Sequence, residues 1–129
     1  MTSMQPDDPL AAALAVLDRH MAALNDRSEE GLAATLHFPH YRLSSGRMQV
    51  WDGPGRYQAD FMARAGEGWA RSRWTRREPI AVSPDKVHLD VEFERLRADG
   101  SGLGRFRSIW VVALKDGRWG AQLRSSFAA

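Results

Sequence analysis

The sequence predicts an α+β fold in which one curved antiparallel sheet wraps around N-terminal helices and encloses a cone-shaped cavity. The first half carries apolar residues at helical spacing, whereas residues 86–127 alternate apolar and polar side chains between turn signals. Asp116-Gly117 marks the sharpest of these turns, because this pair favours a two-residue hairpin. At 129 residues the chain is expected to be a single domain over 1–129, with 1–8 as a loose tail.

Three helices are expected before the long strands. Asp8 and Pro9 provide an N-cap and a first helical residue, and Asn25 and Asp26 end this first helix. Its inner stripe is expected to comprise Leu10, Leu14, Leu17, Met21 and Leu24. A second helix follows, with capping-box spacing between Asp26 and Glu29, and Leu32 and Leu36 form its inner edge before Pro39.

A short strand pair, 41–43 and 47–51, is expected next, followed by the third helix. That helix begins at Gly53-Pro54-Gly55, presents Tyr57 and Phe61 on one face and ends at Gly66. The helix therefore has an apolar face that can cover the mouth of the cone.

The next hairpin has a predictable register. The turn 83–86 pairs Val82 with Val87, which gives the sheet an inner and an outer face. The inner set is Val87, Leu89, Val91, Phe93 and Arg95 with Trp74, Arg76, Glu78, Ile80 and Val82. The outer set is His88, Asp90, Glu92 and Glu94 opposite Arg73 and Arg77, where opposite charges lie across the strands.

The final hairpin, 105–115 with 118–127, is expected to pair regularly outward from its turn. This places Trp110 and Trp119 on one face and Arg107 and Arg124 on the other. Both faces hold apolar side chains, and a second covered face indicates a homodimer that packs sheet against sheet.

Composition excludes several classes of function. The chain has no cysteine, which removes disulfides, thiolate catalysis and cysteine-bound metals, and its net charge is only +2. The arginine-rich segment 71–77 faces acidic residues on the next strand, so no nucleic-acid partner is expected. No signal peptide or membrane span is expected, and the predicted location is cytoplasmic.

Three segments carry a resemblance to a known family: HFPHYRL after the second helix, SPDKVHLDVEFERLRADG, and DGRWGAQLRSSF at the end. With the element order, they resemble the nuclear transport factor 2-like superfamily, which shares the cystatin-like fold, in its SnoaL-like branch of small bacterial proteins. The resemblance implies the cone and favours the homodimer. It implies no single activity, because this superfamily includes isomerases, cyclases, hydrolases, dehydratases and non-enzymatic binders.

The candidate catalytic residues are His40, Tyr57 and Arg95. The first strand offers no carboxylate base of the ketosteroid isomerase type, but His40 could exchange protons near neutrality. Tyr57 would supply a hydroxyl donor, and Arg95 would bind a carboxylate or sit solvated at the rim, with Glu78 as the only inward acid. The expected ligand-binding residues are Trp51, Tyr57, Phe61, Trp74, Phe93, Arg95 and Trp110, although large aromatics also fill cores.

No metal site and no cofactor are expected, since His37 and His40 have no third ligand nearby. Three functions remain open. The first is a small-molecule-binding domain of undetermined ligand. The second is a cofactor-free acid-base enzyme acting on a small, partly apolar substrate. The third is a non-enzymatic dimerisation domain with a cavity closed by its own side chains.

Overall fold

The computed structural model describes residues 8–127, which form three helices and one six-stranded sheet. In chain order the elements are α1 (Pro9–Asn25), α2 (Glu29–Thr35), β1 (Leu36–Ser44), β2 (Arg47–Trp51), α3 (Pro54–Ala65), β3 (Arg71–Ser83), β4 (Lys86–Leu96), β5 (Gly102–Lys115) and β6 (Arg118–Ser126). The predicted α+β class is therefore confirmed. The predicted loose tail lies outside the described residues, apart from Asp8.

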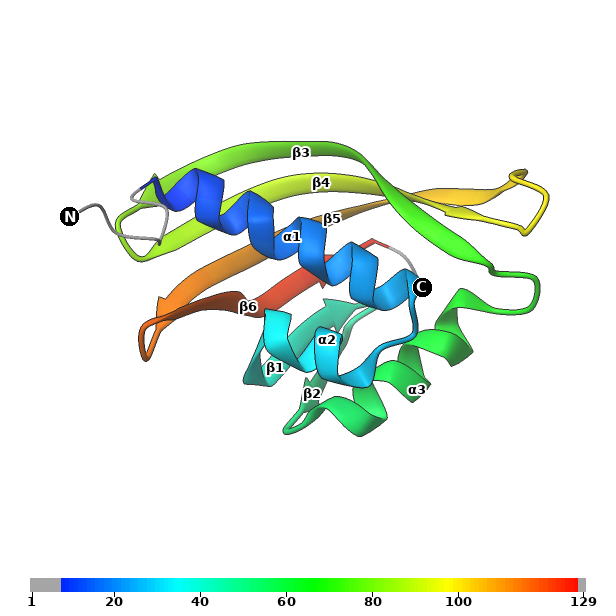
Figure 1. Cartoon of the computed structure of the whole chain (residues 1–129), viewed down its shortest axis with the longest axis horizontal. Coiled ribbons are helices and arrows are strands. Elements are labelled where there is room, and N and C mark those ends of the chain that lie inside the picture. The colour runs from blue at the N-terminus through cyan, green and yellow to red at the C-terminus, as the bar shows by residue number, and fades with distance from the viewer. Residues whose placement is uncertain (1–7, 128–129) are drawn as a thin grey trace.

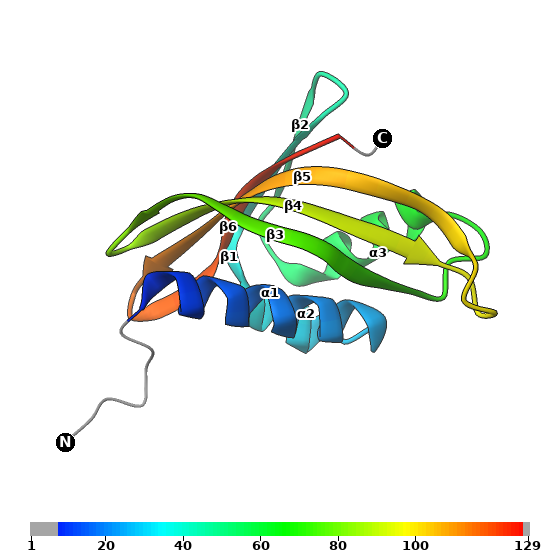
Figure 2. The same ribbon diagram turned by 90° about the horizontal axis from the view of Figure 1, so that it is seen from above.

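The strands run in the order β2-β1-β6-β5-β4-β3, and the sheet is curved (Figures 1 and 2). Figure 1 shows α1 lying along the long strands, with α2 and α3 below it near β1 and β2. The expectation of a wholly antiparallel sheet needs one correction, because β1 and β6 pair in parallel. This pair joins the N-terminal hairpin to the long strands and so completes the curve around the helices.

The helix starts follow local capping chemistry. Asp8 caps α1 as expected, since its side chain accepts a hydrogen bond from the Leu10 amide. The predicted cap of α2 is wrong: Ser28, not Asp26, accepts from the Gly31 amide, and Asp26 is instead the C-cap of α1. Leu36 already belongs to β1. No helix in residues 8–127 is long and apolar enough to cross a membrane.

The β3–β4 register is confirmed at its turn and altered further along. Val82 pairs with Val87 as predicted, but β3 carries register shifts after Trp74 and after Pro79. Between these bulges the side chains of β3 exchange faces. Arg76 and Glu78, expected inside, pair with Glu92 and Asp90 of the outer face, while Arg77, expected outside, donates to Asp18 of α1.

The β5–β6 hairpin also departs from regular pairing, with larger consequences for the interior. Val112 pairs with Ala121 as expected, but the register shifts there and Gln122 is the extra residue on β6. Beyond this bulge Trp110 pairs with Arg124. The prediction that Arg124 faces outward is therefore wrong, because one extra residue moves every following side chain to the opposite face.

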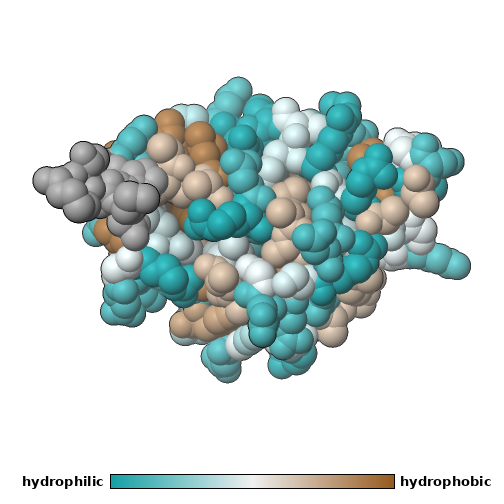
Figure 3. Space-filling model, viewed as in Figure 1, coloured by the Kyte–Doolittle hydropathy of each residue, from teal (hydrophilic) through white to brown (hydrophobic). Residues whose placement is uncertain are grey.

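The inner face of the sheet is divided along its length. At the end near the β3–β4 and β5–β6 turns, Val87, Leu89 and Val112 are fully buried and belong to the same core as Val16 and Leu17 of α1. Toward the other end of the strands, polar side chains replace aliphatic ones. The surface on the side of α1 mixes hydrophilic and scattered hydrophobic residues (Figure 3).

Candidate functional site: a cavity lined by arginines and aromatic rings

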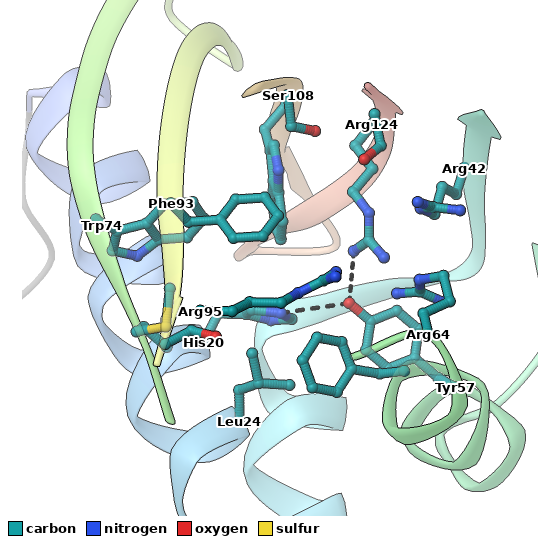
Figure 4. A pocket seen from close by; sticks show the side chains of 15 residues that line it. His20, Leu24, Arg42, Tyr57, Arg64, Trp74, Phe93, Arg95, Ser108 and Arg124 are labelled. Atoms are coloured by element: carbon teal, nitrogen blue, oxygen red, sulfur yellow. Dashed lines mark hydrogen bonds between the residues drawn. The ribbon is translucent and has the colours of Figure 1, made fainter. Parts of the chain in front are cut away.

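A narrow cavity occupies the polar half of the inner face (Figure 4). Its volume is small, about 40 Å³, and it is partly open to solvent. Its walls come from α1, α3, β1 and the four long strands. The lining residues are His20, Met21, Leu24, Arg42, Tyr57, Phe61, Arg64, Ser72, Trp74, Phe93, Arg95, Ser108, Trp110, Arg124 and Ser126.

Most of the residues expected to contact a ligand do line this cavity. They are Tyr57, Phe61, Trp74, Phe93, Arg95 and Trp110. Trp51 does not line it: its ring is buried in the core and its Nε1 donates to the Asp60 carboxylate at 2.8 Å. Tyr57 and Phe61 on α3 and Arg95 on β4, which are distant in the sequence, thus line the same cavity.

His40 lies behind the cavity wall and not in its lining. Its side chain is fully buried, its Nδ1 bonds the Ala121 carbonyl at 3.1 Å, and its ring packs edge-on against Tyr57. Burial, with the positive charge of Arg124 as the next cause, lowers the His40 pKa to about 2. The imidazole is therefore neutral near pH 7, and its predicted catalytic role stays a prediction.

Three arginines of the cavity were not among the predicted site residues. Arg124 was assigned to the outer face because the bulge at Gln122 leaves no clear mark in the sequence. Arg64 could have been found, since it follows Tyr57 and Phe61 by seven and three residues and so shares their helix face. Arg42 could also have been found by its alternation with His40 along one strand.

With Arg95, these side chains form a cluster of four guanidinium groups from β1, α3, β4 and β6 (Figure 4). Among residues 8–127, none that lines the cavity is acidic. Burial, followed by the charge of Arg124, lowers the pKa of Arg42 to about 10 and that of Arg64 to about 9. The same two causes lower the pKa of Arg95. Arg42, Arg64 and Arg95 are thus each desolvated and repelled by Arg124.

Aromatic faces lie where acidic partners would be expected. The Arg95 guanidinium carbon is 4.5 Å from the ring centroid of Phe106, and that of Arg124 is 5.1 Å from the centroid of Trp110. Such cation–π contacts attract the charge without neutralising it. The cavity therefore keeps a net positive field.

A chain of hydrogen bonds fixes Tyr57 at the cavity wall. Arg124 Nη1 donates to the Tyr57 hydroxyl at 2.5 Å, and this hydroxyl lies 3.3 Å from His20 Nε2. His20 Nδ1 lies 2.9 Å from Thr35 Oγ1, which donates to the Leu32 carbonyl.

The donors can be assigned along this chain. Because the Thr35 hydroxyl donates to Leu32, it accepts from His20 Nδ1–H, and Nε2 then accepts the Tyr57 proton. Burial first, and Arg124 second, lower the His20 pKa to about 3, which fits a neutral ring. The phenol oxygen is left to accept from Arg124, so this chain orients that guanidinium.

Among the described residues, no group of three or more histidine, aspartate or glutamate side chains could hold a metal ion. The polar chemistry of the cavity is instead that of arginine, tyrosine and serine. Such a set offers hydrogen-bond donors and positive charge.

Comparison with solved structures identifies the class of fold. A protein of unknown function with a cystatin-like fold from Nostoc punctiforme superposes with a TM-score of 0.73, at 14% identity over 93% of this chain and 90% of its own. An NTF2-like protein from Cytophaga hutchinsonii gives 0.70 at 17% identity over 93% and 98%. A candidate ketosteroid isomerase from Shewanella frigidimarina gives 0.68 at 15% identity over 89% and 94%.

The chain thus has the cystatin-like, nuclear transport factor 2-like fold that the sequence predicted. No family model matches the sequence, and no curated protein matches it. The SnoaL-like branch stays a prediction. At these identities the likeness carries the fold and not an activity, because this fold supports unrelated functions.

Proposed function

We propose that this protein binds a small, partly apolar molecule in the cavity on the inner side of its sheet. The observation that carries the proposal is a cavity with rigid aromatic walls and a few converging polar groups. Ligand sites are typically concave, mainly apolar and equipped with a small number of placed polar side chains.

The walls are held in place before any ligand arrives. Trp74 Nε1 donates to the Leu17 carbonyl at 2.9 Å, so the indole cannot turn freely. The Trp74 ring stands nearly perpendicular to the rings of Phe93 and Trp110, with centroids 6.1 and 5.6 Å away. Such edge-to-face packing favours one arrangement of the rings. A preformed site loses less conformational entropy on binding.

Native mass spectrometry of the purified protein, followed by the same sample denatured, is the direct test. We expect a small molecule that is released on denaturation, or a melting temperature raised by members of a panel of small aromatic compounds. A protein that carries nothing and whose melting temperature no compound raises would contradict the proposal.

A cavity-filling variant with a matched control locates the site. Ser108 is buried in the cavity lining, so Ser108→Phe should fill the space and abolish the ligand-induced shift in melting temperature. Ser125→Phe makes the same change on the opposite face of the same hairpin and should leave that shift unchanged. An unchanged shift in Ser108→Phe would place the binding elsewhere.

A second candidate function is a cofactor-free acid-base enzyme with Tyr57 as its central group. The observation that favours it is the short contact from Arg124 to the Tyr57 hydroxyl at the cavity wall. A hydroxyl held at the cavity wall can exchange a proton with a bound molecule, as acid-base catalysis requires. If a ligand found as above is turned over, Tyr57→Phe should abolish turnover while binding persists. Unchanged turnover in this variant would exclude the role.

The proposed assembly is a homodimer through the outer face of the sheet. An apolar patch supports it: Leu43, Met48, Val50 and Leu123 are all more than a third exposed on β1, β2 and β6. Their register places them on the same outer face. Light scattering of wild type and Leu123→Lys tests this, with a dimer expected for the first and a monomer for the second. A monomeric wild type would contradict it.

A further inference from the structure

We propose that the molecule bound in this cavity carries an oxyanion, a carboxylate or a phosphate, held by Arg95 and Arg64. Its apolar body would lie against Trp74 and Phe93. This inference rests on the proposed binding function and deepens it by naming the chemical class of the ligand.

The first argument is charge. Four guanidinium groups gather around one small space, and none of the described residues lining it is acidic (Figure 4). Like charges in a partly desolvated space repel one another more strongly than in water. An anion that enters this space removes the repulsion and gains attraction to all four groups.

The second argument is unsatisfied hydrogen bonding. Arg95 is only 6% exposed, and its buried Nε has no hydrogen-bond partner. The same holds for Nε and Nη1 of Arg64. Buried donors without partners are rare and costly in native proteins. An edge formed by Nε–H and one Nη–H matches the two oxygens of a carboxylate or phosphate, which bind it in a bidentate manner.

The aromatic contacts do not satisfy these donors. The Arg95 guanidinium carbon lies over the Phe106 ring, 4.5 Å from its centroid, and the ring attracts the charge. The buried Nε–H still has no hydrogen-bond acceptor. The rings therefore hold Arg95 in place and leave its donor edge available.

The other two arginines have different roles. Arg124 Nη1 already donates to Tyr57, and Arg42 Nη1 donates to Gln49 at 3.3 Å. Both contribute positive charge to the space while their orientation is fixed by other side chains. The direct contacts to the anion are therefore assigned to Arg95 and Arg64.

Three probes of similar shape separate charge from size: phenylacetate, phenyl phosphate and the neutral phenylacetamide. Isothermal titration calorimetry of the wild-type protein, stripped of any co-purified molecule, measures each Kd. We expect at least one of the two anions to bind about tenfold or more tightly than the amide, since hydrogen bonds to charged groups are the stronger ones. The tighter anion identifies the head group.

Arg95→Met tests the assigned contact. Methionine retains an unbranched apolar stem and removes the charge and its donors. We expect the preferred anion to bind about tenfold to a hundredfold more weakly, and phenylacetamide to bind as before. Arg105→Met is the matched control, because it removes the same charge from an exposed position on the outer face. It should leave both affinities unchanged.

The melting temperature of the ligand-free variant shows whether a loss of binding reflects misfolding. Arg95→Met should melt at or above the wild-type temperature, and sulfate should stabilise it less than it stabilises wild type. A lower melting temperature with unchanged anion binding would make Arg95 structural and overturn the inference.

The two proposals fail in different ways. If phenylacetamide binds as tightly as both anions, the anionic class is wrong and the binding function stands. If none of the three probes binds and no small molecule co-purifies, both proposals fall.

Discussion

The arginines of this protein lie in two contrasting environments. On the outer face of the sheet, Arg73 bonds Glu94, and Arg107 bonds Asp90, each at 2.8 Å. On the inner face Arg95 and Arg124 lie over aromatic rings, and Arg124 also bonds the Tyr57 hydroxyl. No described residue that lines the cavity is acidic. Arginine side chains on the outer face are paired with carboxylates, whereas those on the inner face keep a positive charge without an acidic partner.

This difference separates a structural use of arginine from a functional one. On the outer face, hydrogen bonds from Arg107 and then Arg76 hold the Asp90 pKa at about 2, so each charge has a partner. Surface pairs of this kind contribute little to stability but keep a strand face soluble and in register. Inside, uncompensated charge costs folding free energy, and such a cost is common where a site is built for a ligand.

The largest expected effect is a loss of stability at acid pH, caused by the buried histidines His20 and His40. The unfolded chain protonates histidine near pH 6.5, whereas burial and Arg124 hold the folded pKa of His20 at about 3 and of His40 at about 2. Protons therefore bind the unfolded state preferentially, and stability falls as pH drops below 6.5. From pH 7 to 5 we expect a loss of about 2 kcal/mol for each of the two histidines.

Urea unfolding at the two pH values measures this loss. In His40→Asn, whose amide can still donate to the Ala121 carbonyl, the pH dependence should shrink by about half. The outer carboxylates contribute only at lower pH, because arginine contacts lower the pKa of Asp90 and of Glu94. A stability that is flat between pH 7 and 5 would mean that the inner histidines accept protons in the folded state.

A smaller effect of opposite sign is expected from one inner arginine. Arg64→Met removes an uncompensated charge and two buried donors without partners, and it keeps a side chain against Phe61. We expect the ligand-free protein to gain about 1 kcal/mol of stability, the scale of one unsatisfied buried donor. Chemical denaturation at low salt measures it. A loss of stability would show that Arg64 has a structural partner and would weaken the contrast between the faces.

The smallest effect is expected from breaking the outer pairs. Arg107→Met removes one of the two arginine partners of Asp90 at an exposed site, so stability should fall slightly. About 1 M sodium chloride should abolish the difference from wild type, because salt screens exposed charges. Thermal melts at low and high salt provide the comparison. A large loss of stability that persists in salt would show that the ion pairs on the outer face contribute substantially to the stability of the fold.

Much of this molecule could be predicted from local patterns. Helical spacing and capping chemistry gave the bounds of α1, with Asp8 as its cap, and the Asp116-Gly117 turn gave the last hairpin. The alternation of β4 assigned Arg95 to the interior. These features depend on neighbours within a few residues, so the sequence contains them directly.

The bulges could not be predicted. Arg124 reaches the cavity only because Gln122 is extra, and Arg76 and Arg77 exchange faces because of the shift after Trp74. Whether a strand admits an extra residue depends on the strands beside it: Gln122 lies between β5 and β1, and its amide donates to the Pro39 carbonyl. Contacts over such sequence distances leave no periodic signal.

The sequence by itself determined the fold class, the helix faces and the inward direction of Tyr57, Phe61 and Arg95. Only the tertiary structure decided that Arg42, Arg64 and Arg124 join Arg95, and that His40 lies behind the wall. The reason is that strand side chains alternate with a period of two, so faces can be read locally until a bulge reverses them. A cluster assembled from four elements exists only once the sheet has curved around its helices.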